Sequence, residues 1–285
     1  MRANAKEISP NQFQQLINQR VTELKEKSQN IKQKETEKSN PRRINEFYEK
    51  ILAIADIPSK LKRESFKSYD CSVKEGFEGK VALVRKFAQS YQNPENIFLY
   101  LGGNVGNGKS HLAVSAAKVI AYQQAKELDA KIDRFMPSKL PNGEVFLFYV
   151  NWRSEIKKIR NSYSNRSSNY SALEVIQKMQ RAKVLVIDDL FARSKISSSD
   201  LDDIFEIVDY RYQRDKLTIF TSNKFPGEYL TSLTPEDLKD NRYNRMNQDD
   251  LDIVTDRIAS RILHGCGSPG VVEFDGPNYR VVSNR

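Results

Sequence analysis

Eight consecutive residues, Gly103-Asn104-Val105-Gly106-Asn107-Gly108-Lys109-Ser110, carry the strongest signal in this chain. They match the pattern G-x-x-x-x-G-K-[ST], in which backbone N–H groups at the start of a helix surround phosphate oxygens. An apolar run at residues 97–101 precedes them and an apolar helical stripe follows them, as the pattern requires. The sequence therefore predicts a phosphate-binding loop, in which Lys109 reaches the β- and γ-phosphates of a nucleotide and Ser110 holds Mg²⁺.

Strand patterns alternate with helix patterns around this loop. Apolar runs predict strands at residues 97–101, 144–150, 184–187 and 217–220, and helical spacing predicts helices at 152–163, 173–181, 199–214 and 250–263. Residues 129–143, which contain two prolines, are expected to form a loop insertion. Such alternation is typical of a parallel α/β sheet with helices on both faces, here the core of a P-loop NTPase.

Polar residues follow the third and fourth predicted strands. Asp188 and Asp189 come directly after residues 184–187, and Asn223 follows the fourth strand. Open α/β sheets bind ligands at the carboxyl ends of their strands, so these side chains are expected near the nucleotide. We expect Asp188 to orient the water shell of the metal, Asp189 to polarise the attacking water and Asn223 to sense the nucleotide state. Paired carboxylates favour ATP hydrolysis over simple binding.

Composition limits the class of protein. The chain has 285 residues, 46 of them basic and 37 acidic, for a formal net charge of +9. No window is long and apolar enough for a membrane helix, and the first residues lack the apolar run of a secretory signal, which predicts a cytoplasmic protein with no membrane partner. Cys71 and Cys266 are too far apart for a CxxC metal site or a disulfide framework.

The N-terminal part of the chain differs from the rest. Residues 1–45 hold ten basic and five acidic side chains, which is +5 of the total +9. Ser9 and Pro10 are typical of a helix start, and an apolar stripe then follows at Phe13, Leu16, Ile17, Val21 and Leu24. The sequence thus predicts two units, a basic helical extension at 1–45 and an ATPase domain at 46–285. The stripe docks either on that domain or, as we prefer, on a partner protein.

Five segments together point to a known family: residues 55–70, 100–120, 184–190, 218–226 and 256–266, followed by a hairpin-like segment at 271–281. Their motifs, among them GGNVGNGKSH, VLVIDDL, TIFTSNKFP and DRIASRILHGC, resemble those of the AAA+ ATPases of the bacterial helicase-loader type, the DnaC/DnaI group with its IstB transposition-helper relatives. Two departures stand out. Phe191 occupies a position where many relatives have Gly, and only 22 residues follow Leu263, too few for a full C-terminal helical lid.

The resemblance implies roles for individual residues. The loop from Gly103 to Ser110 and the following His111 would bind ATP, Ser110 and Asp188 would hold Mg²⁺, and Asp189 and Asn223 would serve catalysis. Arg261 matches the arginine finger that acts on ATP bound by the neighbouring subunit, with Arg257 as second choice. A finger of this kind implies a homo-oligomeric ring or spiral.

The resemblance also implies the biological role. The leading interpretation is an ATP-dependent loader that binds a replicative helicase through its N-terminal helix and single-stranded DNA through the oligomeric core. Candidate DNA contacts are residues 163–170, 193–195 and 242–245, where basic and aromatic side chains cluster. The alternatives are an IstB-like helper of a transposase, a nucleotide-gated adaptor that hardly hydrolyses ATP, and, from another class, a P-loop kinase of small molecules.

Overall fold

The structure is a computed structural model that describes residues 19–20, 40–72, 74–131, 145–164, 171–192, 196–238 and 247–278. The predicted N-terminal helix lies outside the described residues, except for residues 19 and 20, which are helical. The three candidate DNA segments also lie outside them, apart from the helical backbone of residues 163 and 164. In the part of the chain that the structure describes, no helix has the length and hydropathy needed to span a bilayer.

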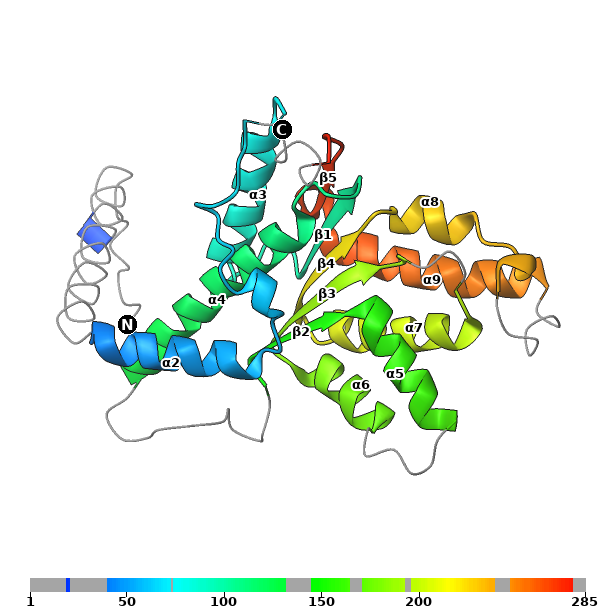
Figure 1. Ribbon diagram of the computed structural model, residues 1–285, viewed down its shortest axis with the longest axis horizontal. Coiled ribbons are helices and arrows are strands. Elements are labelled where there is room, and N and C mark those ends of the chain that lie inside the picture. The colour runs from blue at the N-terminus through cyan, green and yellow to red at the C-terminus, as the bar shows by residue number, and fades with distance from the viewer. Residues whose placement is uncertain are drawn as a thin grey trace, which may run out of the picture.

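Five parallel strands form one sheet in the order β2-β3-β4-β1-β5 (Figure 1). Their bounds are β1 (Phe98–Gly103), β2 (Leu147–Asn151), β3 (Val184–Leu190), β4 (Leu217–Ser222) and β5 (Val271–Phe274). The four predicted strands are confirmed, although β2 begins at Leu147 rather than at residue 144. The first arm of the expected hairpin is β5, which pairs in parallel with β1. Because β4 lies between β1 and β3, its end separates the phosphate loop from the acidic pair.

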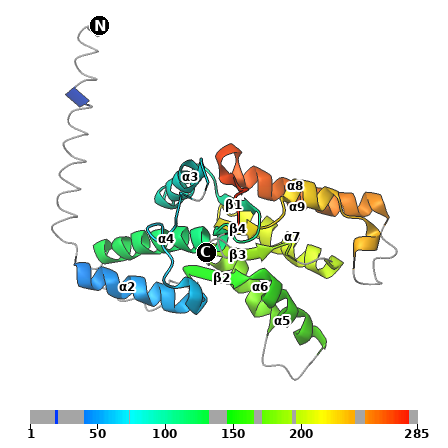
Figure 2. The ribbon, with the colours of Figure 1, turned by 45° about the horizontal axis from the view of Figure 1, so that its top comes forward.

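Helices cover both faces of the sheet, as Figures 1 and 2 show from two sides. One face carries α2 (Pro41–Ile54), α3 (Phe77–Gln89) and α4 (Lys109–Lys131). The other carries α5 (Trp152–Ser164), α6 (Ala172–Arg181), α7 (Ser198–Tyr212), α8 (Pro226–Thr231) and α9 (Gln248–Cys266). Short 3₁₀ turns lie at η1 (Ser59–Leu61), η3 (Pro235–Asp237) and η4 (Ser268–Gly270). The predicted α/β P-loop NTPase core is confirmed, and α2, α3 and α8 are helices that sequence patterns had not identified.

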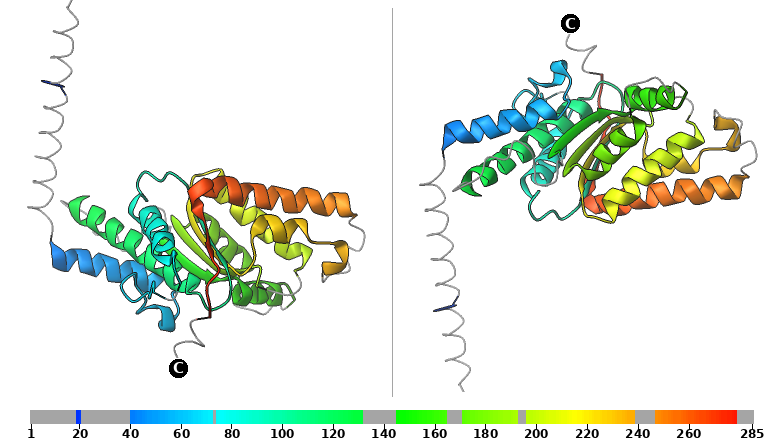
Figure 3. Two further views of the ribbon diagram at one scale, coloured as in Figure 1. Left: turned by 90° about the horizontal axis from the view of Figure 1, so that it is seen from above. Right: turned by 90° about the horizontal axis from the view of Figure 1, so that it is seen from below.

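The two faces have separate apolar cores because side chains alternate along each strand. In β1, Phe98 and Tyr100 belong to the cluster under α5–α9, whereas Leu99 and Leu101 belong to the cluster under α2–α4. Figure 3 shows the two helical layers on either side of the sheet. The sheet is therefore buried on both sides, and its carboxyl edge is where polar side chains gather.

The contact between α2 and α4 involves two predicted boundaries, the start of the loop insertion, which is corrected, and the division at residue 45. Asp129 was expected in a loop, but α4 continues to Lys131. The buried carboxylate of Asp129 accepts a hydrogen bond from the backbone N–H of Asn40 (2.9 Å) and forms an ion pair with Arg43. The domain division at residue 45 falls inside α2, whose Phe47 is buried beside Ala125 of α4. Helix α2 therefore packs with the α/β domain, and the rest of the expected insertion, residues 132–143, lies outside the described residues.

Helix α7 concentrates acidic residues near its start. Asp203 is half-buried, and burial, followed by the charges of Asp200 and Glu206, raises its pKa to about 7. In the unfolded chain the carboxyl ionises near its ordinary pKa of 3.8. Folding therefore penalises the ionised form, so this carboxylate costs stability increasingly as the pH rises from about 4 to about 7, and fully above that.

We therefore expect Asp203→Asn to stabilise the protein by about 2 kcal/mol near pH 8, a value reduced because partial exposure screens the charges. Near pH 4.5 the gain should fall to about a quarter of this value, since the carboxyl is then protonated in the folded state but still mostly ionised in the unfolded state. Urea unfolding at both pH values measures the difference. A gain of equal size at both would contradict the assignment.

Candidate nucleotide-binding site

A cavity of about 570 Å³ opens at the carboxyl edge of the sheet, between β1, β3 and β4. It brings together most of the predicted site: Val105, Gly106, Asn107, Gly108, Lys109, Ser110, His111, Asp189 and Asn223 line it. Leu61, Glu64, Arg153 and Ala192 complete the wall and were not predicted. Gly103 and Asn104 start the loop without lining the cavity. Residues far apart in sequence thus converge where parallel sheets bind ligands.

The phosphate loop needs its glycines. Gly103, Gly106 and Gly108 have φ values of 118°, 84° and 76°, in the left-handed region that favours glycine. A Cβ at Gly108 would lie 2.5 Å from the ring of Tyr69. The Tyr69 hydroxyl in turn donates to the carbonyl oxygen of Asn107 (2.8 Å). Tyr69, which follows η1 in the sequence, therefore covers the loop.

The end of β5 holds the loop from the other side. The carbonyl oxygen of Phe274 accepts hydrogen bonds from the backbone N–H of Asn104 (3.0 Å) and from Nδ2 of Asn107 (2.6 Å). Inside the loop, Lys109 Nζ donates to the carbonyl oxygens of Gly103 (2.8 Å) and Asn104 (2.5 Å). This places an ammonium group at the N-terminus of α4, where both the lysine and the helix dipole favour an anion.

Asp188 is fixed by neighbouring strands and does not line the cavity. Only 4% of the residue is exposed. Its carboxylate accepts hydrogen bonds from the hydroxyls of Tyr149 (2.7 Å) and Thr221 (2.7 Å). Burial, together with the charge of Asp188, raises the pKa of Tyr149, so the phenol remains a donor. Asp188 can orient groups at the edge of the site, but its two hydroxyl partners already occupy both of its oxygens.

Asp189 faces the cavity because β3 is irregular at this point. The register between β3 and β4 shifts between Ile187 and Leu190, and Asp189 adopts a left-handed φ of 59°. Its backbone N–H donates to the Thr221 hydroxyl (3.0 Å) and its carboxylate accepts from Asn151 Nδ2 (3.1 Å). Burial and then the charge of Asp188 raise its pKa, while Asn151 and Lys109 oppose that rise. A held carboxylate with a raised pKa suits a general base.

Phe191, the position at which related sequences often have Gly, also has a left-handed φ, 61°. Its ring is buried and packs against Tyr229 with 5.1 Å between ring centroids. The backbone thus keeps a conformation that glycine adopts without strain, and burial of the phenyl ring offsets the cost.

Besides Leu61, Glu64 and Ala192 of the cavity wall, four residues of the site escaped the sequence patterns: Tyr149, Asn151, Arg153 and Thr221. The first three follow from the position of β2 beside β3, where Asn151 pairs with Asp188 in the strand register. Such neighbours depend on strand order, which no local pattern encodes. Thr221 had a usable signal, because it lies two residues before Asn223 at the end of a predicted strand.

His111 contacts a neighbouring loop. Its Nδ1 lies 3.0 Å from a carboxylate oxygen of Glu64, and its Nε2 lies 2.7 Å from the carbonyl oxygen of Ser65. Its ring packs edge-on against Tyr69 at 5.4 Å. His111 therefore joins α4 to the segment that follows η1 and supports the wall of the cavity.

The two candidate finger arginines lie outside the cavity, on α9. Arg261 Nε donates to Asp209 of α7 (2.9 Å), and its guanidinium lies 5.4 Å from the centre of the Tyr212 ring. Arg257 is exposed and stacks over Phe205 at 5.1 Å. Neither residue lines the cavity of its own chain. Any action on ATP would therefore have to be on a nucleotide bound by another subunit.

The donors of the cavity fit a hard cation beside phosphates. Ser110 supplies a hydroxyl, an oxygen ligand of the kind that Mg²⁺ prefers, whereas Asp188, the predicted metal carboxylate, does not line the cavity. Among the described residues no group of three or more His, Cys, Asp or Glu side chains could hold a metal. A bound Mg²⁺ would thus depend on phosphate oxygens and water for its remaining ligands.

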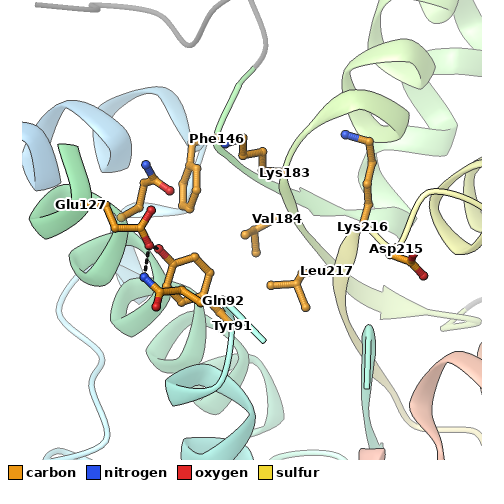
Figure 4. Close-up of a pocket in the computed structure, with 10 residues that line it drawn as sticks. Tyr91, Gln92, Glu127, Phe146, Lys183, Val184, Asp215, Lys216 and Leu217 are labelled. Carbon is orange, nitrogen blue, oxygen red and sulfur yellow. Dashed lines mark hydrogen bonds between the residues drawn. The ribbon is translucent and has the colours of Figure 1, made fainter. Parts of the chain in front are cut away.

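A second cavity, of about 440 Å³, lies at the opposite edge of the sheet (Figure 4). It is bordered by Val184 and Leu217, the first residues of β3 and β4, and by Glu127 of α4. Tyr91 and Gln92 both donate to the Glu127 carboxylate. Because it lies at the amino ends of the strands and its acids and lysines are mixed, it is not the nucleotide site.

Comparison with solved structures identifies the fold. A crystal structure of the DnaC helicase loader shares 19% identity, with 76% of this chain and 100% of that chain aligned at a TM-score of 0.51. A structure of DnaI matches at 20% identity over 78% of this chain and 94% of that one, with a TM-score of 0.49. The replication initiator DnaA, bound to AMPPCP and single-stranded DNA, matches at 18% identity over 76% of this chain and 51% of that one, with a TM-score of 0.45.

No protein-family model matches the sequence, and no curated protein sequence does. The likeness to DnaC nevertheless spans that whole chain. The chain thus has the α/β P-loop fold of that structure, and the resemblance that its motifs predicted is confirmed at the level of fold.

Proposed function

We propose that this chain is an ATPase that binds ATP and Mg²⁺ in the cavity at the carboxyl edge of the sheet. One observation carries the proposal: a single cavity is lined by the phosphate loop, by Asp189 and by Asn223, which belong to three different strand ends. A phosphate loop alone would suit any nucleotide-binding protein. A carboxylate with a raised pKa facing it supplies a group that can accept a proton from water.

Each residue of the proposed site has a separate role. Backbone N–H groups of the loop and the Lys109 ammonium bind the phosphates, and Ser110 binds the metal. Bound Mg²⁺ would neutralise charge on the phosphates. Asp189 orients the attacking water and takes its proton, with Asn151 holding the carboxylate. Asp188, held by two hydroxyls, would act on Mg²⁺ only through its water shell, and Asn223, which lines the cavity, would contact the γ-phosphate.

Arg261 is proposed to complete the site of a neighbouring subunit in a ring or spiral, with Arg257 as the alternative. We expect an Arg261→Ala subunit and a Lys109→Ala subunit each to be inactive. An equimolar mixture should recover about a quarter of wild-type ATP turnover, because about half of the intact nucleotide sites then face an intact finger. Phosphate release across a series of mixing ratios measures the recovery.

Asp209→Asn is the matched control, since it removes the ion pair with Arg261 but leaves the guanidinium. If the arginine acts on a neighbour, this variant keeps most of its turnover. Co-assembled subunits that show no recovery would exclude Arg261, and the same mixture with Arg257→Ala then tests the second candidate.

For the biological role we propose a cytoplasmic loader of a replicative helicase. The supporting observations are the DnaC-like fold and the basic extension with its apolar stripe before α2. In this proposal the extension binds the helicase, and the oligomeric ATPase domain binds single-stranded DNA. The loader releases its partners when ATP is hydrolysed. We also propose that the two units divide near the start of α2 rather than at residue 45, because α2 packs on α4.

Capture experiments with the full chain test the partner. Immobilised chain should retain a purified replicative helicase when ATP is present, and a chain that lacks residues 1–39 should not. Retention of a transposase instead would support the IstB-like role. Phosphate release without any acceptor molecule separates both from a small-molecule kinase, which would need one.

A further inference from the structure

A groove on the face opposite α5–α9 is not used by the nucleotide site. It has a volume of about 570 Å³ and is walled by α2, α3 and α4 and by the segment after η1. Figures 1 and 2 both show α2 lying along α4. The residues that line it are Asn45, Tyr48, Ser65, Phe66, Lys67, Arg85, Gln89, Ser115, Lys118, Val119, Tyr122, Gln123 and Lys126.

The groove is basic. Lys67, Arg85, Lys118 and Lys126 line it, and no carboxylate does. Other lysines on the same side of the molecule have acidic partners, as Lys74 and Lys80 do with Asp275. Lys118 has the charges of Glu49 and Glu64 nearby, but within the described residues the exposed cations Lys67, Arg85 and Lys126 have no acidic partner in an ion pair. Clustered cations without counter-charges favour an anionic ligand.

Aromatic side chains line the groove, and two of their rings make cation–π contacts. The Arg85 guanidinium lies 5.1 Å from the centre of the Phe66 ring, and Lys126 Nζ lies 5.0 Å from that of Tyr122. Tyr48 packs edge-on against Tyr122 at 5.8 Å, and Tyr122 remains 42% exposed. A ligand must therefore offer apolar groups to the rings and negative charge to the cations beside them.

The groove is formed without a ligand. Lys118 Nζ donates to the carbonyl oxygens of Lys62 (2.9 Å) and Glu64 (2.8 Å), which anchors the segment after η1 to α4. His111 anchors the same segment through the carbonyl oxygen of Ser65 (2.7 Å). Because the wall is already held in place, a ligand would not have to order it on binding.

We propose that this groove docks an acidic, amphipathic segment of a partner protein. The chain's own N-terminal segment fits poorly, because residues 1–39 hold eight basic and five acidic side chains. Nucleic acid fits less well than a peptide. Cations already occupy one face of the Phe66 and Tyr122 rings, which leaves less ring surface on which nucleic-acid bases could stack. A helix with apolar and acidic side chains one turn apart matches both the aromatic rings and the cations of the groove.

The test selects peptides without presuming their charge. A display library of random peptides of about 16 residues is selected against the full chain, and the winners are synthesised with a fluorescent label. Their affinity is measured by fluorescence anisotropy for the wild type, for the double variant Lys67→Glu/Lys126→Glu and for Lys157→Glu. Lys157 is an exposed lysine on α5, outside the groove, and serves as the matched control. Circular dichroism confirms that each variant is folded.

We expect the selected peptides to be enriched in Asp and Glu together with aromatic or aliphatic residues. The double variant should bind these peptides at least about tenfold more weakly, and the Lys157→Glu control should change their affinity less than about twofold. Selection of neutral or basic peptides, or equal binding to the double variant, would overturn the proposal. So would an oligo(dT) strand of about 20 nucleotides that binds the wild type, loses affinity in the double variant and displaces the peptides, since the groove would then be a nucleic-acid site.

Discussion

Asp189→Asn should lower ATP turnover at least about 100-fold and leave the affinity for ATP within about threefold of wild type. The amide keeps the size and the position of the side chain, but it cannot accept a proton from the attacking water. Phosphate binding depends on the loop and Lys109, which the substitution does not touch. Single-turnover hydrolysis and equilibrium binding of a labelled nucleotide measure the two quantities separately.

Asp203→Asn is the control for this prediction. Asp203 is also a half-buried carboxylate with a raised pKa, but it lies on α7 outside the cavity. It should keep near-wild-type turnover. Turnover of wild type should also fall as the pH drops through the raised pKa of Asp189, since only the ionised carboxylate acts as base. Unchanged turnover in Asp189→Asn would remove Asp189 from the catalytic role.

Arg211→Met should destabilise the protein by about 3–5 kcal/mol in urea unfolding. Arg211 is completely buried, at 0% exposure, and donates to the carbonyl oxygens of Met179 (2.7 Å), Ala182 (2.8 Å) and Leu217 (2.5 Å). It thus ties the end of α6 to the start of β4. Methionine fills the space but leaves these carbonyls buried without donors, and main-chain carbonyls cannot be removed to compensate.

Arg214→Met is the matched control, because Arg214 is exposed and stacks on Tyr210 at the same end of α7. Its unfolding free energy should change by less than about 1 kcal/mol. A loss in Arg211→Met no larger than this would mean that the carbonyls find other donors. Because Arg211 lies far from the cavity lining, ATP affinity of the folded variant should stay near wild type.

The phosphate loop and the α/β class could be predicted because both depend on local sequence. The glycines of the loop have to accept left-handed backbone, and the strands are apolar throughout because both faces of the sheet are buried. The order of the strands was not predictable in this way. Placing β4 between β1 and β3 requires contacts between segments more than a hundred residues apart, such as Leu99 with Ile219.

For the acidic pair, too, the sequence identified the residues but could not predict their surroundings. The pattern Asp188-Asp189 identified both carboxylates, but their different settings arise from a register shift in β3 and from hydroxyls on β2 and β4. Helix α2 could have been found, since Asn40 and Pro41 are typical of a helix start and the Asn40 side chain does accept from the backbone N–H of Arg42 (3.1 Å). Its packing on α4 could not.

The central claim is that the cavity between β1, β3 and β4 binds ATP through Lys109. Calorimetric titration of the full chain with ATP and Mg²⁺ tests it most directly, with Lys157→Ala as the matched control. The account predicts one binding site per chain, a loss of affinity of at least about 100-fold in Lys109→Ala and no change in Lys157→Ala. Equal ATP binding by the wild type and Lys109→Ala, or no binding by either, would contradict it.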